Sequence, residues 1–103
     1  MNRVYRYKIE IGHNGPVVID MPLGAQIIHV ETQHGVPCLW AVVDPDALPV
    51  EREFEVYGTG HRMREATYTT EAGNQGRTAL IHRGTFMLED GGLVFHLFER
   101  QPL

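Results

Sequence analysis

The residues best suited to chemistry stand together at positions 57–62, where the sequence reads YGTGHR. Two glycines can expose backbone N–H groups to an anion, and a hydroxyl, an imidazole and a guanidinium beside them add further donors. Alternatively, the glycines bend or end a strand, because glycine adopts backbone angles that other residues avoid. The motif has neither the further glycine and helix of a dinucleotide site nor the lysine of a P-loop, so neither nucleotide fold is predicted.

Arginines extend this candidate site along the chain. Between Thr59 and Arg83 four arginines stand against two acidic residues, whereas the rest of the chain has five basic and eleven acidic residues. The net-positive stretch of a protein with net charge −4 therefore follows the glycine motif. A tyrosine at the start of the motif offers a ring on which a base could stack. We predict an anionic, nucleotide-like ligand bound by Tyr57, Gly58, Thr59, Gly60, His61, Arg62, Arg64, Arg77 and Arg83.

Catalytic and metal chemistry find less support in the residue pattern. The chain has no serine, and its one cysteine, Cys38, lies in the apolar run VPCLWAVV, where a thiol packs as a small hydrophobe. None of the six histidines belongs to an H-x-H or H-E-x-x-H motif, so we predict no metal site and no cofactor. The acids Glu51, Glu53 and Glu55 alternate along a strand, which is typical of a solvated face. An enzyme is therefore the third alternative.

Composition indicates a soluble globular protein. The 103 residues are 43% hydrophobic and 21% charged, enough for one core but not for two. We expect a single domain over 1–103, with 62–78 as a long polar loop or extended ribbon. A single cysteine excludes an internal disulfide framework, and no window is long and apolar enough to span a bilayer. We expect a cytoplasmic protein, and the acidic net charge argues against duplex nucleic acid as a partner.

Period-two alternation of apolar and polar residues predicts strands along most of the chain. His34-Gly35 and Asp90-Gly91-Gly92 are hairpin signals, and the segments around Pro22 and Pro45 are typical of turns. The sequence therefore predicts an all-β fold: an antiparallel meander of about six or seven strands that forms a small sandwich or open barrel, with little or no helix.

Three strands carry apolar residues in unusual patterns. Residues 36–43 are apolar on both faces, which predicts a central, doubly covered strand with Trp40 in the core. In 25–33 the alternation places Ile28 on the same face as Val30. The last strand has apolar residues on both faces as well, at 93–98. Because its second face needs a cover, we expect a homo-oligomer.

The order of these motifs resembles a family of small proteins of unknown function encoded by phages, prophages and bacteria. The resemblance lies in YKIEI, in GVPCLWAVVDP, in YGTGH and in GTFMLEDGGLVFH, and it covers most of 3–61 and 84–99. It implies a β fold and a gene context but no catalytic residues. The stretch around 62–80 is longer here than the family pattern, so a function built on that stretch is not implied by the resemblance.

Two functions of different classes follow from these observations. The first is a non-enzymatic phage-type accessory protein that acts in counter-defence, binding a nucleotide-like signal as an oligomer in the host cytoplasm. The second is a protein–protein module that inhibits a host protein or serves as a virion or assembly component. The second function would use the acidic face at 51–55 or the apolar strand at 93–98 and would not need the arginines.

Overall fold

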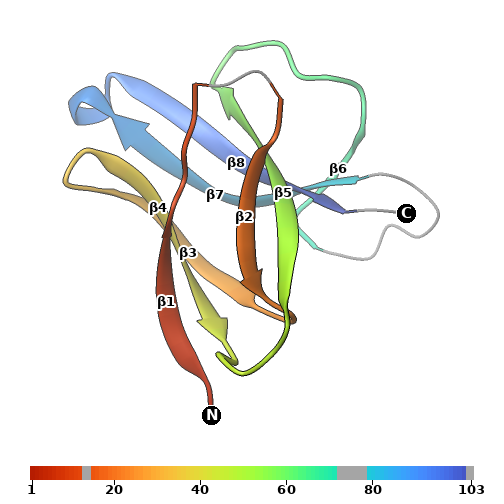
Figure 1. The fold of residues 1–103 in the computed structure, drawn as a ribbon. Coiled ribbons are helices and arrows are strands. Elements are labelled where there is room, and N and C mark those ends of the chain that lie inside the picture. Colours follow the sequence, from red (N-terminus) through yellow and green to blue (C-terminus); the bar gives the residue numbers. More distant parts are fainter. Residues whose placement is uncertain (13–14, 72–78, 102–103) are drawn as a thin grey trace.

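The computed structural model describes residues 1–12, 15–71 and 79–101, and the protein folds there into eight strands and one short 3-10 turn. Sheet A has the strand order β1-β4-β3, and sheet B has the order β2-β5-β8-β7-β6 (Figure 1). The predicted all-β class is confirmed, and the two sheets do not close into a barrel. The elements are β1 (Arg3–Lys8), β2 (Val17–Pro22), β3 (Gln26–Gln33), β4 (Val36–Val43), β5 (Pro49–Gly58), β6 (Thr67–Thr69), β7 (Ala79–Leu88), η1 (Glu89–Gly91) and β8 (Leu93–Gln101).

The connectivity differs from the predicted meander. The chain enters sheet A with β1, passes to sheet B with β2, returns to sheet A for β3 and β4, and ends in sheet B with β5 to β8. Strand β6 pairs with β7 in parallel through residues 67–69. This three-residue strand raises the count above the predicted six or seven, because it is too short to show an alternation in the sequence.

Local turn chemistry sets the hairpins. His34 and Gly35 both have positive φ, at 51° and 79°, as a two-residue hairpin turn between β3 and β4 requires. The β7–β8 hairpin also forms, with positive φ at Glu89, Asp90 and Gly91. Both predicted hairpins are confirmed. The backbone N–H of Asp46 donates to Asp44 Oδ1 (3.0 Å) in the turn that carries the chain from sheet A to sheet B.

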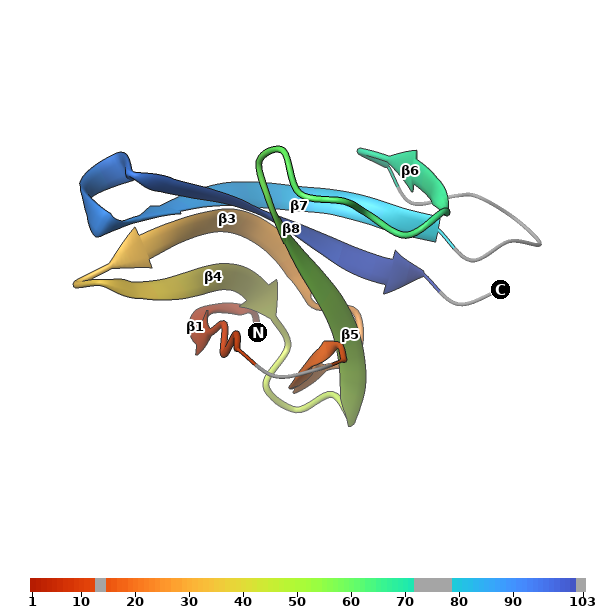
Figure 2. The same ribbon diagram turned by 90° about the horizontal axis from the view of Figure 1, so that it is seen from above.

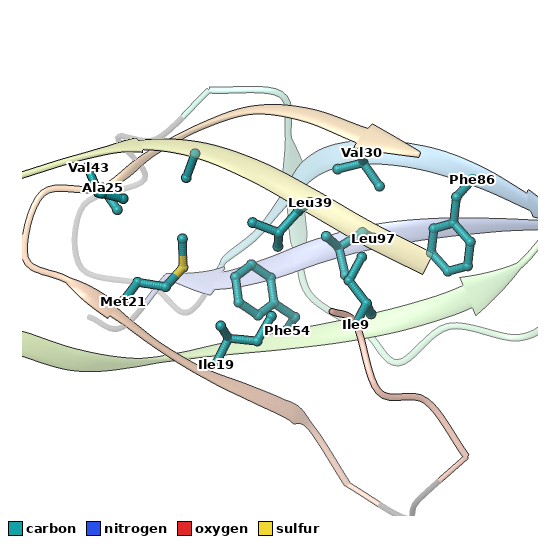
Figure 3. Packing of buried hydrophobic residues seen from close by; sticks show 11 residues of the cluster. Ile9, Ile19, Met21, Ala25, Val30, Leu39, Val43, Phe54, Phe86 and Leu97 are labelled. Atoms are coloured by element: carbon teal, nitrogen blue, oxygen red, sulfur yellow. The ribbon is translucent and has the colours of Figure 1, made fainter. Parts of the chain in front are cut away.

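Both sheets contribute to one core. Phe54, Leu39 and Leu97 come from β5, β4 and β8 and are completely buried. The two sheets contact each other mainly where β3 lies alongside β7 (Figure 2). Figure 3 shows how side chains of six strands meet in this cluster, which consists of Ile9, Ile19, Met21, Ala25, Val30, Leu39, Ala41, Val43, Phe54, Phe86 and Leu97.

Two predictions about buried residues are wrong. A register shift between Ile27 and His29 makes Ile28 the extra residue of a bulge, so it is 53% exposed, while Val30 stays in the core. The alternation read from the sequence does not reveal the bulge. Trp40 is half-buried and lies outside the core cluster, with the ring of His29 at 5.7 Å. Strand β4 is central, but only in a three-stranded sheet whose outer face is partly open.

The second apolar face of β8 is covered by the chain itself. The ring of Phe98 has Tyr57 and Tyr68 as edge-on neighbours, at centroid distances of 6.2 and 6.1 Å. The sequence argument for an oligomer assumed that this face was open, so it no longer supports one. No helix among the described residues is long and apolar enough to cross a membrane.

Candidate functional site

The glycine motif ends strand β5 in a tight turn. The N–H of His61 donates to the carbonyl of Gly58 (3.0 Å), and Gly60 has a φ of 85°. The N–H of Thr59 donates to the carbonyl of Val94 (3.0 Å). The backbone N–H groups of Thr59 and His61 are therefore used within the fold, and the glycines stand at a strand end, as in the alternative interpretation.

Beside this turn, a hydrogen-bonded series of side chains runs across the outer face of sheet B. Thr59 Oγ1 lies 2.7 Å from Nε2 of His96, and Thr85 Oγ1 lies 3.0 Å from its Nδ1. The ring of His82 is 5.3 Å from that of Phe98. This arrangement fixes the orientation of His96, and it ties the turn to β7 and β8.

A buried carboxylate, Glu55, lies at the centre of this outer face of sheet B. It is only 8% exposed, so the predicted solvated acidic face is wrong at this position. Arg64 Nε donates to both of its oxygens (3.0 and 2.9 Å), and Arg100 Nε donates to Oε2 (2.6 Å). The hydroxyl of Tyr57 donates to Oε1. Burial by itself raises the pKa of Glu55, but these hydrogen bonds outweigh it and lower the pKa from 4.5 to about 2.

A second buried carboxylate, Glu99, lies on the opposite face of the sheet. It lies two residues after the core residue Leu97, on the same face of β8, and is 6% exposed. Arg52 binds it with two nitrogens (2.5 and 2.7 Å) and uses the third to donate to the carbonyl of Ala25 (2.6 Å). Arg83 Nε adds a fourth bond to this cluster (2.9 Å). Two buried glutamates thus each hold two arginines.

A cleft opens between β5 and β8 where these two clusters meet. The pairing of the strands ends at Phe54 and Glu99, and Arg100 pairs only with Leu80 of β7. The strands diverge beyond this point and leave a cleft of about 670 Å³. Its lining consists of Glu51, Arg52, Glu53, Arg64, Glu99, Arg100 and Gln101.

The structure brings together only part of the predicted ligand-binding set. Tyr57 and Arg64 meet at Glu55, whereas Arg83 is directed to Glu99 on the other face. Arg62 is exposed and has no hydrogen bond or ion pair with the residues that the structure describes. Arg77 falls outside the described residues.

Sequence reasoning missed Glu55, Glu99, Arg52 and Arg100 as members of the site. The two arginines lie outside the net-positive stretch, and the two glutamates look like ordinary strand acids. The one usable signal was the occurrence of charged residues within strongly apolar strands, as in LVFHLFER. A charge in such a strand is favourable only with a partner, but the sequence does not identify that partner.

The described part of the chain contains no group of three or more histidine, cysteine, aspartate or glutamate residues that could hold a metal ion. The free thiol of Cys38 is buried. Neither observation assigns a reaction to the cleft.

One family model matches residues 1–103, and its description is a domain of unknown function, DUF7352. The match confirms that the relatives of this chain form a family of unknown function, while their origin in phages stays a prediction. No match was found among curated proteins or among solved structures.

Proposed function

We propose that this chain, which belongs to that family of unknown function, is a non-enzymatic binding protein for a small anionic, nucleotide-like ligand. One observation carries the proposal: Arg64 and Arg100 lie side by side on the carboxylate of Glu55 and line the cleft between β5 and β8. Two guanidinium groups held together at the wall of one cleft are suited to a phosphate group.

The buried carboxylate prepares both arginines for a ligand. The side chains of Arg64 and Arg100 are 38% and 32% exposed, whereas that of Glu55 is 8% exposed. Glu55 therefore holds the guanidinium groups from their buried side and leaves part of each in contact with solvent. The Nη1 atom of Arg100 forms an ion pair with Oε2 of Glu53 at 3.7 Å, a distance too long for a hydrogen bond. An anion would find these donors already oriented, which lowers the entropic cost of binding.

Aromatic residues next to the cleft favour a ligand that also carries a base. Tyr57 donates to the same carboxylate as Arg64, and Tyr68 donates its hydroxyl proton to the carbonyl of Arg64. Tyr68 is 45% exposed. A phosphate on the two arginines would place a base within reach of these rings, and stacking of this kind contributes about 1–3 kcal/mol per base.

The wider role in this proposal is that of a phage-type accessory protein in counter-defence, which captures a nucleotide-like host signal in the cytoplasm and acts as an oligomer. The resemblance of the sequence to small phage and prophage proteins supports this role.

Calorimetric titration tests the proposal with pyrophosphate, mononucleotides and cyclic dinucleotides as probes. At least one of these probes is expected to bind. Arg100→Gln should lower the affinity for that probe by roughly tenfold or more, because a charge-assisted hydrogen bond is lost. Arg62→Gln is the matched control, because it removes the same charge from an exposed side chain that does not line the cleft. Circular dichroism establishes that both variants fold. The proposal fails if no probe binds the wild type, or if both variants weaken binding equally.

A protein–protein module is the second candidate, and one observation favours it. A groove of about 880 Å³ lies between the β3–β4 and β7–β8 hairpins, and Met87 (55% exposed) and Leu93 (41% exposed) are among its lining residues. Apolar side chains at such a groove are suited to a protein partner. If a host protein binds there, Met87→Glu should abolish co-purification of one stoichiometric partner, while Arg100→Gln leaves it intact.

A further inference from the structure

The outer face of sheet A carries an apolar patch at the centre of the sheet. Strand β4 presents Trp40 and Val42 on this face, and Val4 of β1 lies directly opposite Val42 in the register. Val4 is 57% exposed, and the other two are half-buried. The opposite face of β4 supplies Leu39 and Ala41 to the core. A strand that is apolar on both faces normally has both of them covered.

The chain covers the corresponding face of sheet B but leaves this one partly open. On sheet B, Tyr68 of β6 packs against Phe98. On sheet A, the side chain of Arg6 in β1 extends across β4 and donates to Gln33 in β3. In the register, Cys38 of β4 lies between the levels of these two residues, and it is 1% exposed. Arg6 lies opposite Trp40 in the register, and Gln33 lies opposite Val36, so this bond runs away from the level of Val42 and does not cover Val42 or Val4.

Charges flank the patch in a self-complementary arrangement. Lys8 of β1 and Glu31 of β3 both pair with Cys38 in the register, so they stand at the same level on opposite sides of β4. Both are exposed. Lys8 thus borders one side of the face, and Glu31, whose Oε1 lies 3.2 Å from Nε2 of His29, borders the other.

We propose that this face is the interface of a homodimer whose twofold axis runs approximately parallel to β4. A rotation about that axis places β1 of one copy over β3 of the other at the same level, with the sheets about 10 Å apart. Each Lys8 then faces Glu31 of the second copy, and the two Trp40 rings meet near the axis. An isologous interface requires a surface that complements itself, and this one does.

A second copy fits the surface better than an unrelated protein for that reason. A foreign partner would need its own acid opposite Lys8 and its own base opposite Glu31, whereas a second copy of the chain supplies both. The inference is independent of the ligand, because the cleft lies between two strands of sheet B and remains open in such a dimer.

Sedimentation and fluorescence on the full chain test the dimer. The monomer mass is 11.7 kDa, and we expect twice this value at high concentration, with dissociation on dilution. The chain has one tryptophan, so its emission reports on this face alone. The emission should shift to longer wavelength as the dimer dissociates, because Trp40 then becomes hydrated. A protein that is monomeric up to millimolar concentration overturns the proposal.

Charge reversal distinguishes this interface from any other. Lys8→Glu and Glu31→Lys should each weaken the dimer by roughly tenfold or more through like-charge contacts, and the double variant should restore it. Asp20→Lys, an exposed residue of β2 in sheet B, changes the net charge as much as Glu31→Lys and should leave the dimer unchanged. A dimer that persists in both single variants, or that the double variant does not restore, places the interface elsewhere.

Discussion

Val30 of β3 and Gly84 of β7 approach so closely that a Cβ atom at position 84 would lie 2.5 Å from the Cβ of Val30. No real pair of such atoms approaches this closely, so the sheets must separate if position 84 gains a side chain. We predict that Gly84→Ala destabilises the protein by about 2 kcal/mol or more through overpacking. Urea denaturation followed by circular dichroism measures the change in the free energy of unfolding.

A second substitution identifies the cause of that loss. Val30→Ala removes the two Cγ atoms that the new methyl group would meet at 2.6 and 3.4 Å but keeps the Cβ, so its cost and the cost of Gly84→Ala should only partly add. We expect the double variant to lose about 1 kcal/mol less free energy of unfolding than the two single variants lose in sum. Strict additivity would show that the contact between the sheets does not determine the cost.

Glu55 supports the fold as well as the cleft. Its replacement by glutamine removes the charge that faces Arg64 and Arg100, and breaking a buried pair in this way costs about 3 kcal/mol. We therefore predict a large loss of stability in Glu55→Gln. The side chain of Glu53 is 50% exposed, and Glu53→Gln should change stability by less than about 0.5 kcal/mol. Thermal and urea unfolding of both variants provide the comparison, and equal effects would contradict the assigned role of Glu55.

Because of the same carboxylate, we expect the free energy of unfolding to fall as the pH is lowered. The pKa of Glu55 is about 2 in the folded protein, below the ordinary value of 4.5. The unfolded chain therefore takes up its proton first as the pH falls, and the stabilisation that is complete above pH 4.5 is lost between about 4.5 and 2. The loss attributable to this group is of the order of 3 kcal/mol. Urea unfolding at several pH values should show a shallower decline in Glu55→Gln than in wild type.

The two glycines of the YGTGH motif should respond differently to alanine. Gly60 has a φ of 85°, where alanine is strained, so Gly60→Ala should cost about 1 kcal/mol. At Gly58 a Cβ atom would meet only the ring of His61, at 2.7 Å, and this exposed side chain can move away. We expect Gly58→Ala to cost less than about 0.5 kcal/mol. Equilibrium unfolding of the two variants measures the difference, and a reversed order would contradict the turn.

Local features of the fold follow from the sequence because they depend on neighbouring residues. The turns at His34-Gly35 and at residues 89–91 have positive φ, and the glycines and Asp90 mark them in the sequence. The alternation within the strands reflects a backbone whose side chains point to opposite faces in turn. The all-β class and the hairpins could therefore be predicted from the sequence alone.

The members of the candidate site were decided by the tertiary structure. Glu55 and Arg100 are 45 residues apart, and Glu99 and Arg52 are 47 apart, so no local pattern reveals that either pair meets. The bulge at Ile28 and the exposure of Trp40 also depend on register and on the chain's return to sheet A. Sequence composition located arginines near the glycine motif, but it could not show that Arg64 and Arg83 would turn to opposite faces of one sheet.

The physical reason is the range of the interactions. Backbone preferences and alternation act over a few residues, so the sequence determined which segments become strands and where they turn. Burial of a charge is favourable only when the opposite charge arrives with it, and strand pairing brings those partners from distant positions. The cleft between β5 and β8, with its two arginines on one buried glutamate, therefore exists only once the sheets are assembled.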